Sequence, residues 1–248
     1  MKSKSLLLER KYHDSVAETY NHRRLQDYIW EVPEEVFLLH KPFFPPGSKV
    51  VDMVCGPAIS VSRILGQSLL NSIFYTGVDL SRNLLNFAQK NIPNGKFVYH
   101  DMSSVTFPKS ELDILLSFGA LHHCEHKIKI PKRWLALIKP GGLMLLREPI
   151  YEFLKRGTGE SPIEEGLKLE ELLQFIHSYN IKVMRRTFFS TNAFRLCNRI
   201  MIKLGLGSWQ RMRILWYPVL YVDALLAKLS TLHSIFKPQE FAIILQKR

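Results

Sequence analysis

The chain has 248 residues, of which 46% are hydrophobic, so it can bury a sizeable core and is predicted to be a folded globular protein. Its formal charge of +12 and isoelectric point near 9.6 indicate attraction to an anionic partner, either nucleic acid, an acidic membrane face or a phosphorylated substrate. Three widely separated cysteines do not make a disulfide framework, which favours a reducing, cytoplasmic location.

Two apolar segments bear on export and membrane insertion. The N-terminal MKSKSLLLERKYHD has a run of three leucines, which is too short for the core of a signal peptide. Residues 214–222 (ILWYPVLYV) contain Pro218 and fall short of the roughly 20 apolar residues that a spanning helix needs. The sequence therefore predicts neither export by a signal peptide nor a transmembrane helix.

Residues 1–45 are expected to form an N-terminal helical cap. Residues 10–40 place apolar and aromatic side chains, among them Val16 and Tyr20, at helical spacing. The segment KPFFPPGSK then breaks the pattern with three prolines and a glycine, which is typical of a linker into a new unit.

Strand-like and helix-like segments alternate after this linker. In chain order they are KVVDMV, VSRILGQSL, FYTGVDL, SRNLLNFAQKN, KFVYHD, LDILLSF, IPKRWLALI and GLMLLREP. Alternation at this spacing is typical of parallel βα units, and the strands are near-continuous apolar runs, as in a sheet that is covered on both faces. The fold class is therefore predicted to be α/β, with a doubly wound sheet.

The C-terminal part is expected to complete the same unit around an insertion. A helix (LKLEELLQFIHSY) and a strand (IKVMRRTFFS) follow the alternating segments, and EFAIILQK closes the chain as a last strand. Between them, residues 191–236 are mostly helical in pattern, apolar and basic. The predicted domains are thus 1–45, then 46–190 together with 237–248, with 191–236 as a helical insertion.

Two acidic residues follow neighbouring predicted strands. Asp52 ends the first strand and runs into CGPA, a turn of small residues that lets backbone amides approach a ligand. Asp79 ends the second strand, where a carboxylate can accept hydrogen bonds from both ribose hydroxyls of an adenosine ligand. Asp52 could instead be a loop carboxylate that caps neighbouring amides, and Asp79 could be the N-cap of the helix SRNLLNFAQ, but together they favour a ligand site at this edge of the sheet.

Five blocks of sequence carry a resemblance to a known family. They are VVDMVCGPA, GVDLSRNLLNFAQKN, FVYHDMSSVTFP, LDILLSFGALHHC and LIKPGGLMLLREP. In their order and spacing they resemble the class I S-adenosylmethionine-dependent methyltransferases, most closely those of the ubiquinone/menaquinone-biosynthesis type, which act on small molecules or lipids. The resemblance implies a Rossmann-like, seven-stranded sheet with an antiparallel last strand, and S-adenosyl-L-methionine as the cofactor.

The resemblance also implies roles for individual residues. The loop from Asp52 to Ala58, which includes Val54, Cys55 and Gly56, would hold the methionine moiety of the cofactor. Asp79 would hold the ribose with Leu80 beside the adenine, and Asp101 would hold the adenine amino group with Met102 against the ring. Ser117, at the end of the fourth strand, and Tyr20, in the N-terminal cap, complete the predicted cofactor site; Tyr20 could equally be a core aromatic.

The first turn departs from the family pattern at two positions where glycine is usual. Ala58 is a small change, whereas Val54 is β-branched, resists positive φ and could crowd the methionine portion of the cofactor. An inactive protein that keeps the fold as a binding or scaffold protein is therefore one alternative. A nicotinamide-dependent oxidoreductase is another, but the turn lacks the three spaced glycines of a dinucleotide fingerprint.

The segment SFGALHHCEH (117–126) lies just after the fourth strand, beside the expected position of the methyl group. His122 or His123 could accept a proton from an attacking hydroxyl or amine, and Glu148 after the fifth strand is a second candidate. Structural or capping roles remain open for both histidines, and alignment of the reactants could make a base unnecessary. The segment also invites a metal site, but the sequence shows no second pair of ligands, so no metal is predicted.

The acceptor is predicted to be a small molecule or lipid-like compound, phosphorylated or sugar-containing forms included. The fourth strand is followed by SFGALHH rather than by the acidic or asparagine residue, two prolines and aromatic of amino-group nucleic-acid methyltransferases, which disfavours nucleic acid. The predicted function is methyl transfer to oxygen, nitrogen or carbon of such an acceptor.

The insertion is the expected place for the acceptor pocket. Arg195, Arg199 and Lys203 recur every four residues, which places them on one helical stripe. A cap helix with solvated charges is one interpretation. The other is an element that lies peripherally on the anionic inner face of a membrane, with its aromatic and aliphatic side chains in lipid and its arginines at the headgroups. In this second interpretation the contacting residues are Trp209, Arg211, Arg213, Leu215, Trp216 and Tyr217.

Overall fold

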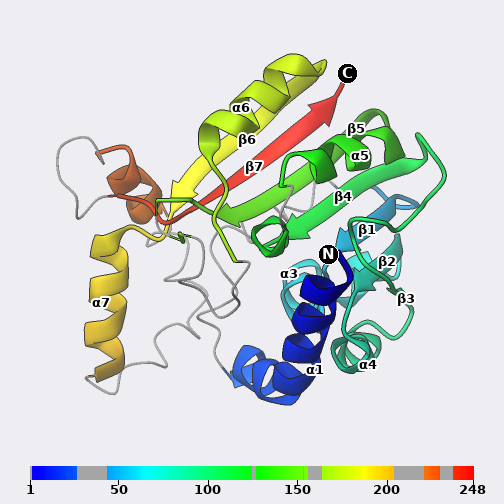
Figure 1. The fold of residues 1–248 in the computed structure, drawn as a ribbon, viewed down its shortest axis with the longest axis horizontal. Helices are drawn as coiled ribbons and strands as arrows, with labels where there is room; N and C mark the ends of the chain where they lie inside the picture. The colour runs from blue at the N-terminus through cyan, green and yellow to red at the C-terminus, as the bar shows by residue number, and fades with distance from the viewer. Residues whose placement is uncertain are drawn as a thin grey trace.

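The protein is built on one mixed sheet, in the order β3-β2-β1-β4-β5-β7-β6 (Figure 1). The computed structural model describes residues 2–26, 44–124, 127–152, 154–155, 164–203, 221–229 and 237–248. The strands are β1 (Lys49–Met53), β2 (Phe74–Asp79), β3 (Lys96–Tyr99), β4 (Leu112–Phe118), β5 (Ile138–Pro149), β6 (Ile181–Phe189) and β7 (Glu240–Lys247).

Strands β1 to β5 are parallel to one another, and β7 runs antiparallel to both β5 and β6. Register places Asp52 beside Gly77 of β2 and Leu116 of β4. This order and the direction of β7 confirm the predicted seven-stranded, Rossmann-like sheet with an antiparallel last strand. The parallel strands end at one edge, which is where open α/β sheets bind their ligands.

Helices follow the strands as the alternation predicts. They are α1 (Lys2–Gln26), α3 (Ile59–Leu70), α4 (Arg82–Asn91), α5 (Lys129–Leu137), α6 (Leu169–Ser178), α7 (Asn192–Lys203) and the short 3₁₀ turn η3 (Leu121–His123). Ser81 caps α4, because its hydroxyl accepts a hydrogen bond from the Leu84 amide. The alternative of Asp79 as the cap of this helix is therefore wrong.

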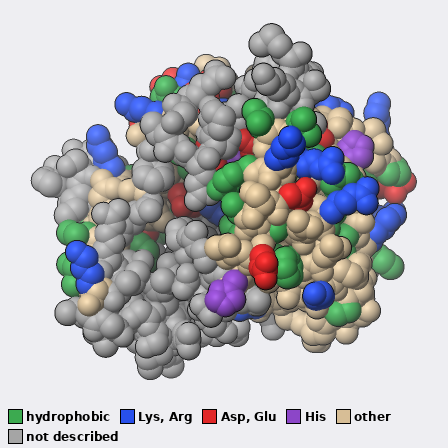
Figure 2. All heavy atoms as spheres, turned by 60° about the horizontal axis from the view of Figure 1, so that its bottom comes forward, with side chains coloured by type: hydrophobic (Ala, Val, Ile, Leu, Met, Phe, Trp, Pro, Cys, Tyr) green, Lys and Arg blue, Asp and Glu red, His purple; other side chains and the backbone are tan. Residues whose placement is uncertain are grey.

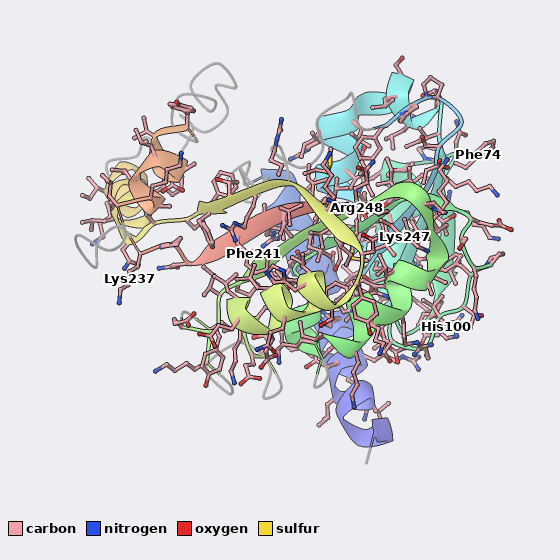
Figure 3. All side chains as sticks on the ribbon, turned by 90° about the horizontal axis from the view of Figure 1, so that it is seen from above. Phe74, His100, Lys237, Phe241, Lys247 and Arg248 are labelled. Atoms are coloured by element: carbon pink, nitrogen blue, oxygen red, sulfur yellow. The ribbon has the colours of Figure 1, made fainter. Side chains whose placement is uncertain are left out.

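The sheet is covered on both faces (Figure 3). One hydrophobic core joins the sheet to α5 and α6, and the other joins it to α3 and α4. Neighbouring residues of β4 alternate between them, with Leu115 in the first core and Leu116 in the second, both fully buried. Burial on two faces explains why the strands are continuous apolar runs rather than alternating ones.

Helix α1 packs against α4 and begins beside the end of β4 (Figure 1). The Ser81 hydroxyl donates to Asp14 Oδ1 at 2.6 Å, and the Asn83 side-chain amide donates to the backbone carbonyl of Asp14. The predicted N-terminal helix is thus present over residues 2–26. The rest of the predicted helical cap lies outside the described residues.

Helix α7 confirms helical structure at the start of the predicted insertion, and residues 221–227 form a further helical segment. Asp223 ties the two together, because its carboxylate accepts hydrogen bonds from the amides of Ser190 and Thr191 and from the Thr191 hydroxyl. The predicted lipid-facing residues 209–217 lie outside the described residues. Within the described part of the chain, no helix has the length and apolar character to cross a membrane.

Candidate active site

The chain leaves β1 through a turn in which three residues have a positive φ. The angles are 62° at Val54, 54° at Gly56 and 52° at Ala58, which is the residue before α3. Positive φ costs little at glycine but is strained at a β-branched residue. The two positions where the related family usually has glycine are therefore positions whose backbone favours it, and Val54 adopts this conformation all the same.

A pocket lies on this turn. It is lined by Tyr20, Asp52, Val54, Cys55, Gly56, Pro57, Ala58, Ile59, Ser60, Val61, Phe118 and Arg147. Six of the predicted cofactor-binding residues thus meet at one cavity, including Tyr20 from α1. Phe118 and Arg147, from the ends of β4 and β5, were not predicted from the sequence.

Asp52 is buried at the floor of this region and is held by a partner from the next strand. The Tyr75 hydroxyl donates to Asp52 Oδ2 at 2.7 Å, and both side chains are buried. Burial, together with the neighbouring Asp52 carboxylate, raises the pKa of Tyr75 well above its ordinary value, so the phenol stays a donor. This hydrogen bond holds the Asp52 carboxylate in a fixed orientation beside the pocket.

Replacing Tyr75 with phenylalanine is expected to lower the free energy of unfolding by roughly 2 kcal/mol, because a buried carboxylate loses a charge-assisted hydrogen bond while the ring keeps its packing. Urea unfolding at pH 7 measures the change. Tyr99→Phe is the matched control, since the Tyr99 ring instead faces the guanidinium groups of Arg10 and Arg82. Equal losses in both variants would contradict the role given to Tyr75.

Asp79 links the turn after β1 to the start of α4. The Gly56 amide donates to Asp79 Oδ2 at 2.8 Å, and the Ser81 amide donates to Oδ1 at 2.9 Å. The residue is only 3% exposed, and burial raises the pKa of its carboxyl against the opposing effects of these amides and of His13. Asp79 therefore stands at the carboxyl edge of the sheet, in contact with the turn that lines the pocket.

The residues predicted to face the adenine follow β2 and β3, outside the lining of the pocket. Leu80 is half-buried next to Asp79. The Asp101 carboxylate accepts hydrogen bonds from the amide and hydroxyl of Ser103 in its own loop. Met102 is buried in the core that contains α5. They share the edge of the sheet with Asp79.

Ser117 provides a test of whether the site fits a ligand. It is fully buried near the end of β4, and its hydroxyl has no hydrogen-bond partner among the residues that the structure describes. Buried hydroxyl groups usually have a partner. Ser117 is not among the residues that line the pocket, so its role in binding the cofactor stays a prediction.

Glu148 and His122 form a pair at this end of the sheet, with His122 just beyond β4 in η3. Glu148 lies within β5, opposite Phe241 of β7, so its predicted place after the fifth strand is wrong by two residues. Glu148 is fully buried, and its carboxylate accepts hydrogen bonds from the amides of Ala120, Leu121 and His122 and lies 3.1 Å from His122 Nδ1. Burial alone would raise the pKa of Glu148, but the His122 ring and the amides outweigh it and hold this pKa below its ordinary value. Glu148 is therefore an ionised anchor for η3 and for the His122 ring.

His123 turns toward a different set of residues. Its Nδ1 lies 3.3 Å from Glu9 Oε2 and 3.5 Å from Glu164 Oε1, and Glu9 Oε2 also lies 3.4 Å from His13 Nε2. We call Glu9, His13, His123 and Glu164 the histidine–glutamate cluster. Apart from His123, its members were not predicted from the sequence. The one available signal is the spacing of Glu9 and His13, four residues apart on one helix.

Comparison with known proteins agrees with this geometry. Residues 50–142 match the family model described as a methyltransferase domain. A 2-methyl-6-phytyl-1,4-hydroquinone methyltransferase from Synechocystis sp. is 31% identical over 107 residues, which cover 42% of this chain and 33% of that protein. A trans-aconitate 2-methyltransferase from Delftia acidovorans is 32% identical over 103 residues, which cover 40% of this chain and 37% of that protein. The chain thus matches little more than a third of the length of these relatives.

Solved structures show the same fold over most of the chain. The plantazolicin methyltransferase BpumL, in complex with SAH, superposes with a TM-score of 0.56 at 15% identity and covers 94% of this chain and 89% of that one. Magnesium protoporphyrin IX methyltransferase from Synechocystis, with bound SAM, gives 0.56 at 16% identity over 75% of this chain and 91% of that one. Residues 50–142 thus match a methyltransferase domain, and the chain shares its fold with solved S-adenosylmethionine-dependent methyltransferases.

Proposed function

We propose that this protein is an S-adenosylmethionine-dependent methyltransferase that acts on oxygen, nitrogen or carbon of a small-molecule acceptor. The observation that carries the proposal is the pocket on the turn after β1, with Asp52 at its wall and Asp79 hydrogen-bonded to the same turn. Backbone amides and two buried carboxylates at the carboxyl edge of a parallel sheet suit a cofactor that has an amino-acid end and a ribose.

Different residues would hold different parts of the cofactor. The turn of Val54, Gly56 and Ala58 would hold the methionine end, because its positive φ angles bring backbone close to the pocket. Asp79 would accept the ribose hydroxyls, and Asp101 would accept the adenine amino group. S-adenosylmethionine would supply, when bound, an activated methyl group for in-line transfer to the acceptor, with S-adenosylhomocysteine as the leaving group.

Of the three predicted catalytic residues, His122 is the one to which we assign the proton of the acceptor. Its Nδ1 faces the Glu148 carboxylate, which leaves the other ring nitrogen to take a proton from a hydroxyl or amine. Glu148 acts as a positioning residue, because its oxygens face amides and the His122 ring. His123 belongs to the histidine–glutamate cluster instead.

A small-molecule acceptor is supported by the names of the relatives, which act on a phytyl hydroquinone, trans-aconitate and phosphoethanolamine. The Lys and Arg side chains that gather on the right of the face in Figure 2, with the net charge of +12, also favour an acceptor with an anionic group. Because one relative acts on a phytyl hydroquinone, the proposed class of acceptors includes lipid-like compounds. A nicotinamide oxidoreductase has no comparable support, and neither does a scaffold protein.

Mass spectrometry of the purified protein tests the proposal, with a search for co-bound S-adenosylhomocysteine and for any acceptor. Calorimetric titration with S-adenosylmethionine and S-adenosylhomocysteine supplies the second measurement. We expect S-adenosylmethionine and S-adenosylhomocysteine both to bind, with affinities typical of an enzyme for its cofactor. Absence of detectable binding of either compound would rule out the enzyme and leave a protein that only keeps the fold.

Replacing Val54 with glycine is expected to tighten S-adenosylhomocysteine binding severalfold, because the change removes a side chain that lines the pocket. The free energy of unfolding should change by less than about 1 kcal/mol, since relief of the strain at φ 62° offsets lost packing. Val54→Ala is the matched control: it also opens the pocket but keeps a β-carbon at positive φ, so it should be less stable than the glycine variant. Unchanged affinity in both would show that Val54 does not crowd the cofactor.

A further inference from the structure

The histidine–glutamate cluster brings together metal-ligating groups from three separate segments. Glu9 and His13 come from α1, His123 from η3, and Glu164 from the segment before α6. The ligand atoms of Glu9, His13 and His123 all lie within 4.8 Å of one another. We propose that this cluster binds a divalent transition-metal ion, with Zn²⁺ as the ion that suits it best.

The spacing of the ligand atoms fits a tetrahedral zinc ion. Zinc bonds to histidine nitrogen and carboxylate oxygen of about 2.0–2.1 Å place neighbouring ligands of a tetrahedron about 3.3–3.4 Å apart. The Glu9 oxygen lies 3.3 Å from the His123 nitrogen and 3.4 Å from the His13 nitrogen. The Glu164 oxygen lies 3.5 Å from the same His123 nitrogen. Two imidazoles and one carboxylate, with water in the fourth position, are a common zinc ligand set. Glu164 lies beside His123 and outside this group of three ligand atoms.

His123 shows that ion pairing alone does not satisfy the cluster. Its Nδ1 is buried and forms no hydrogen bond of acceptable geometry with any described residue, although two carboxylate oxygens lie within 3.5 Å. A nitrogen at contact distance but without hydrogen-bond alignment is placed as a ligand would be. Such an atom needs a partner, because an unsatisfied buried polar group is costly.

The charges of the cluster also favour a cation. Glu9 is 5% exposed and Glu164 is 7% exposed, so a cation in the cluster would lie beside buried, anionic side chains. A divalent ion would place positive charge beside both carboxylates.

Metal binding at this cluster would fasten α1 to the turn after β4. Figure 1 shows the first turns of α1 beside that end of the sheet. Zinc binding and methyl transfer are separate properties, so the failure of one proposal would not refute the other. A protein that binds zinc without the cofactor, or the cofactor without zinc, would separate the two.

The test uses full-length protein without a histidine tag, stripped with chelator and dialysed. Titration with ZnCl₂ followed by elemental analysis is expected to give about one zinc per chain, and CoCl₂ is expected to give the intense visible bands of tetrahedral cobalt. Removal of zinc from the loaded protein should lower its thermal midpoint, since a ligand that binds only the folded state stabilises it.

His123→Ala and Glu9→Gln are expected to weaken zinc binding by about 100-fold and to abolish the cobalt bands. His177→Ala is the matched control, because His177 is exposed on α6, away from the cluster. If the wild-type protein takes up no zinc and shows no tetrahedral cobalt spectrum, the inference is wrong and the four residues form only an ion-pair cluster. This outcome is measured on the wild type and so does not depend on whether the variants fold. Equal zinc affinity in wild type and both variants would overturn it as well.

Discussion

Replacing Asp79 with alanine is expected to weaken binding of S-adenosylhomocysteine by more than tenfold. The Asp79 carboxylate stands at the end of β2 and is hydrogen-bonded to the Gly56 amide in the turn that lines the pocket. Loss of two charge-assisted hydrogen bonds to ribose hydroxyls costs about 1.5–3 kcal/mol each, well above the 1.4 kcal/mol that corresponds to tenfold. Calorimetric titration of the wild type and the variant measures the difference.

The fold of the Asp79→Ala variant should remain intact. Burial raises the pKa of Asp79, which means that the ionised side chain is less favourable in the folded protein than in the unfolded chain. This contribution destabilises the fold as pH rises through that pKa, so removal of the carboxylate relieves a cost at neutral pH. Circular dichroism and a thermal midpoint close to that of the wild type are the expected observations.

Asp113→Asn is the matched control for this experiment. Asp113 lies at the opposite end of the sheet, near the start of β4, where it accepts a hydrogen bond from the Lys49 amide and pairs with Lys139. Its loss should reduce stability and leave cofactor affinity unchanged. If Asp79→Ala binds S-adenosylhomocysteine as tightly as the wild type does, Asp79 does not hold the ribose.

The fold was predictable because the strands can be recognised in the sequence as apolar runs. A parallel sheet that is packed on both faces needs apolar side chains at successive positions, and LDILLSF and EFAIILQK coincide with β4 and β7 residue by residue. The antiparallel direction of β7 came from the family resemblance alone. Nothing in the composition of a strand that is buried on both faces specifies the direction in which it pairs.

The turn after β1 shows where local propensity is overridden. Valine disfavours positive φ, yet Val54 has a φ of 62° because β1 before it and α3 after it are both fixed by their hydrophobic contacts. The sequence identified the unusual residue correctly. The sequence could not indicate whether the backbone at Val54 would keep the positive φ that the turn favours or adopt the negative φ that valine favours.

The histidine–glutamate cluster could not be predicted, because its members lie far apart in the chain. His123 and Glu164 come from different loops, and Glu9 reaches them only because α1 is held against α4 through Asp14 and Ser81. Such docking depends on side-chain hydrogen bonds with no periodic signature. The same holds for Tyr75, whose hydroxyl fixes Asp52 from a neighbouring strand.

Replacing Glu148 with glutamine is expected to lower the free energy of unfolding by about 3 kcal/mol at pH 7, because a fully buried carboxylate that faces three amides and a histidine ring loses its charge. The folded pKa of Glu148 lies below the ordinary 4.5, so its charge stabilises the folded state. This difference between wild type and variant should be fully present above about pH 4.5 and should disappear as pH falls through the lower, folded pKa. Urea unfolding at a series of pH values measures it.

Methyl transfer by the Glu148→Gln variant should fall by about 100-fold in kcat, with cofactor affinity and the KM for the acceptor little changed, because the variant loses only the orientation of His122. The acceptor for this assay is the one found by mass spectrometry of the purified protein. Glu111→Gln is the control, since Glu111 is exposed and pairs with Lys49 on the surface, where an ion pair contributes little. A kcat that stays at the wild-type value while stability drops would limit Glu148 to a structural role, because a positioning residue must change the rate of the chemical step.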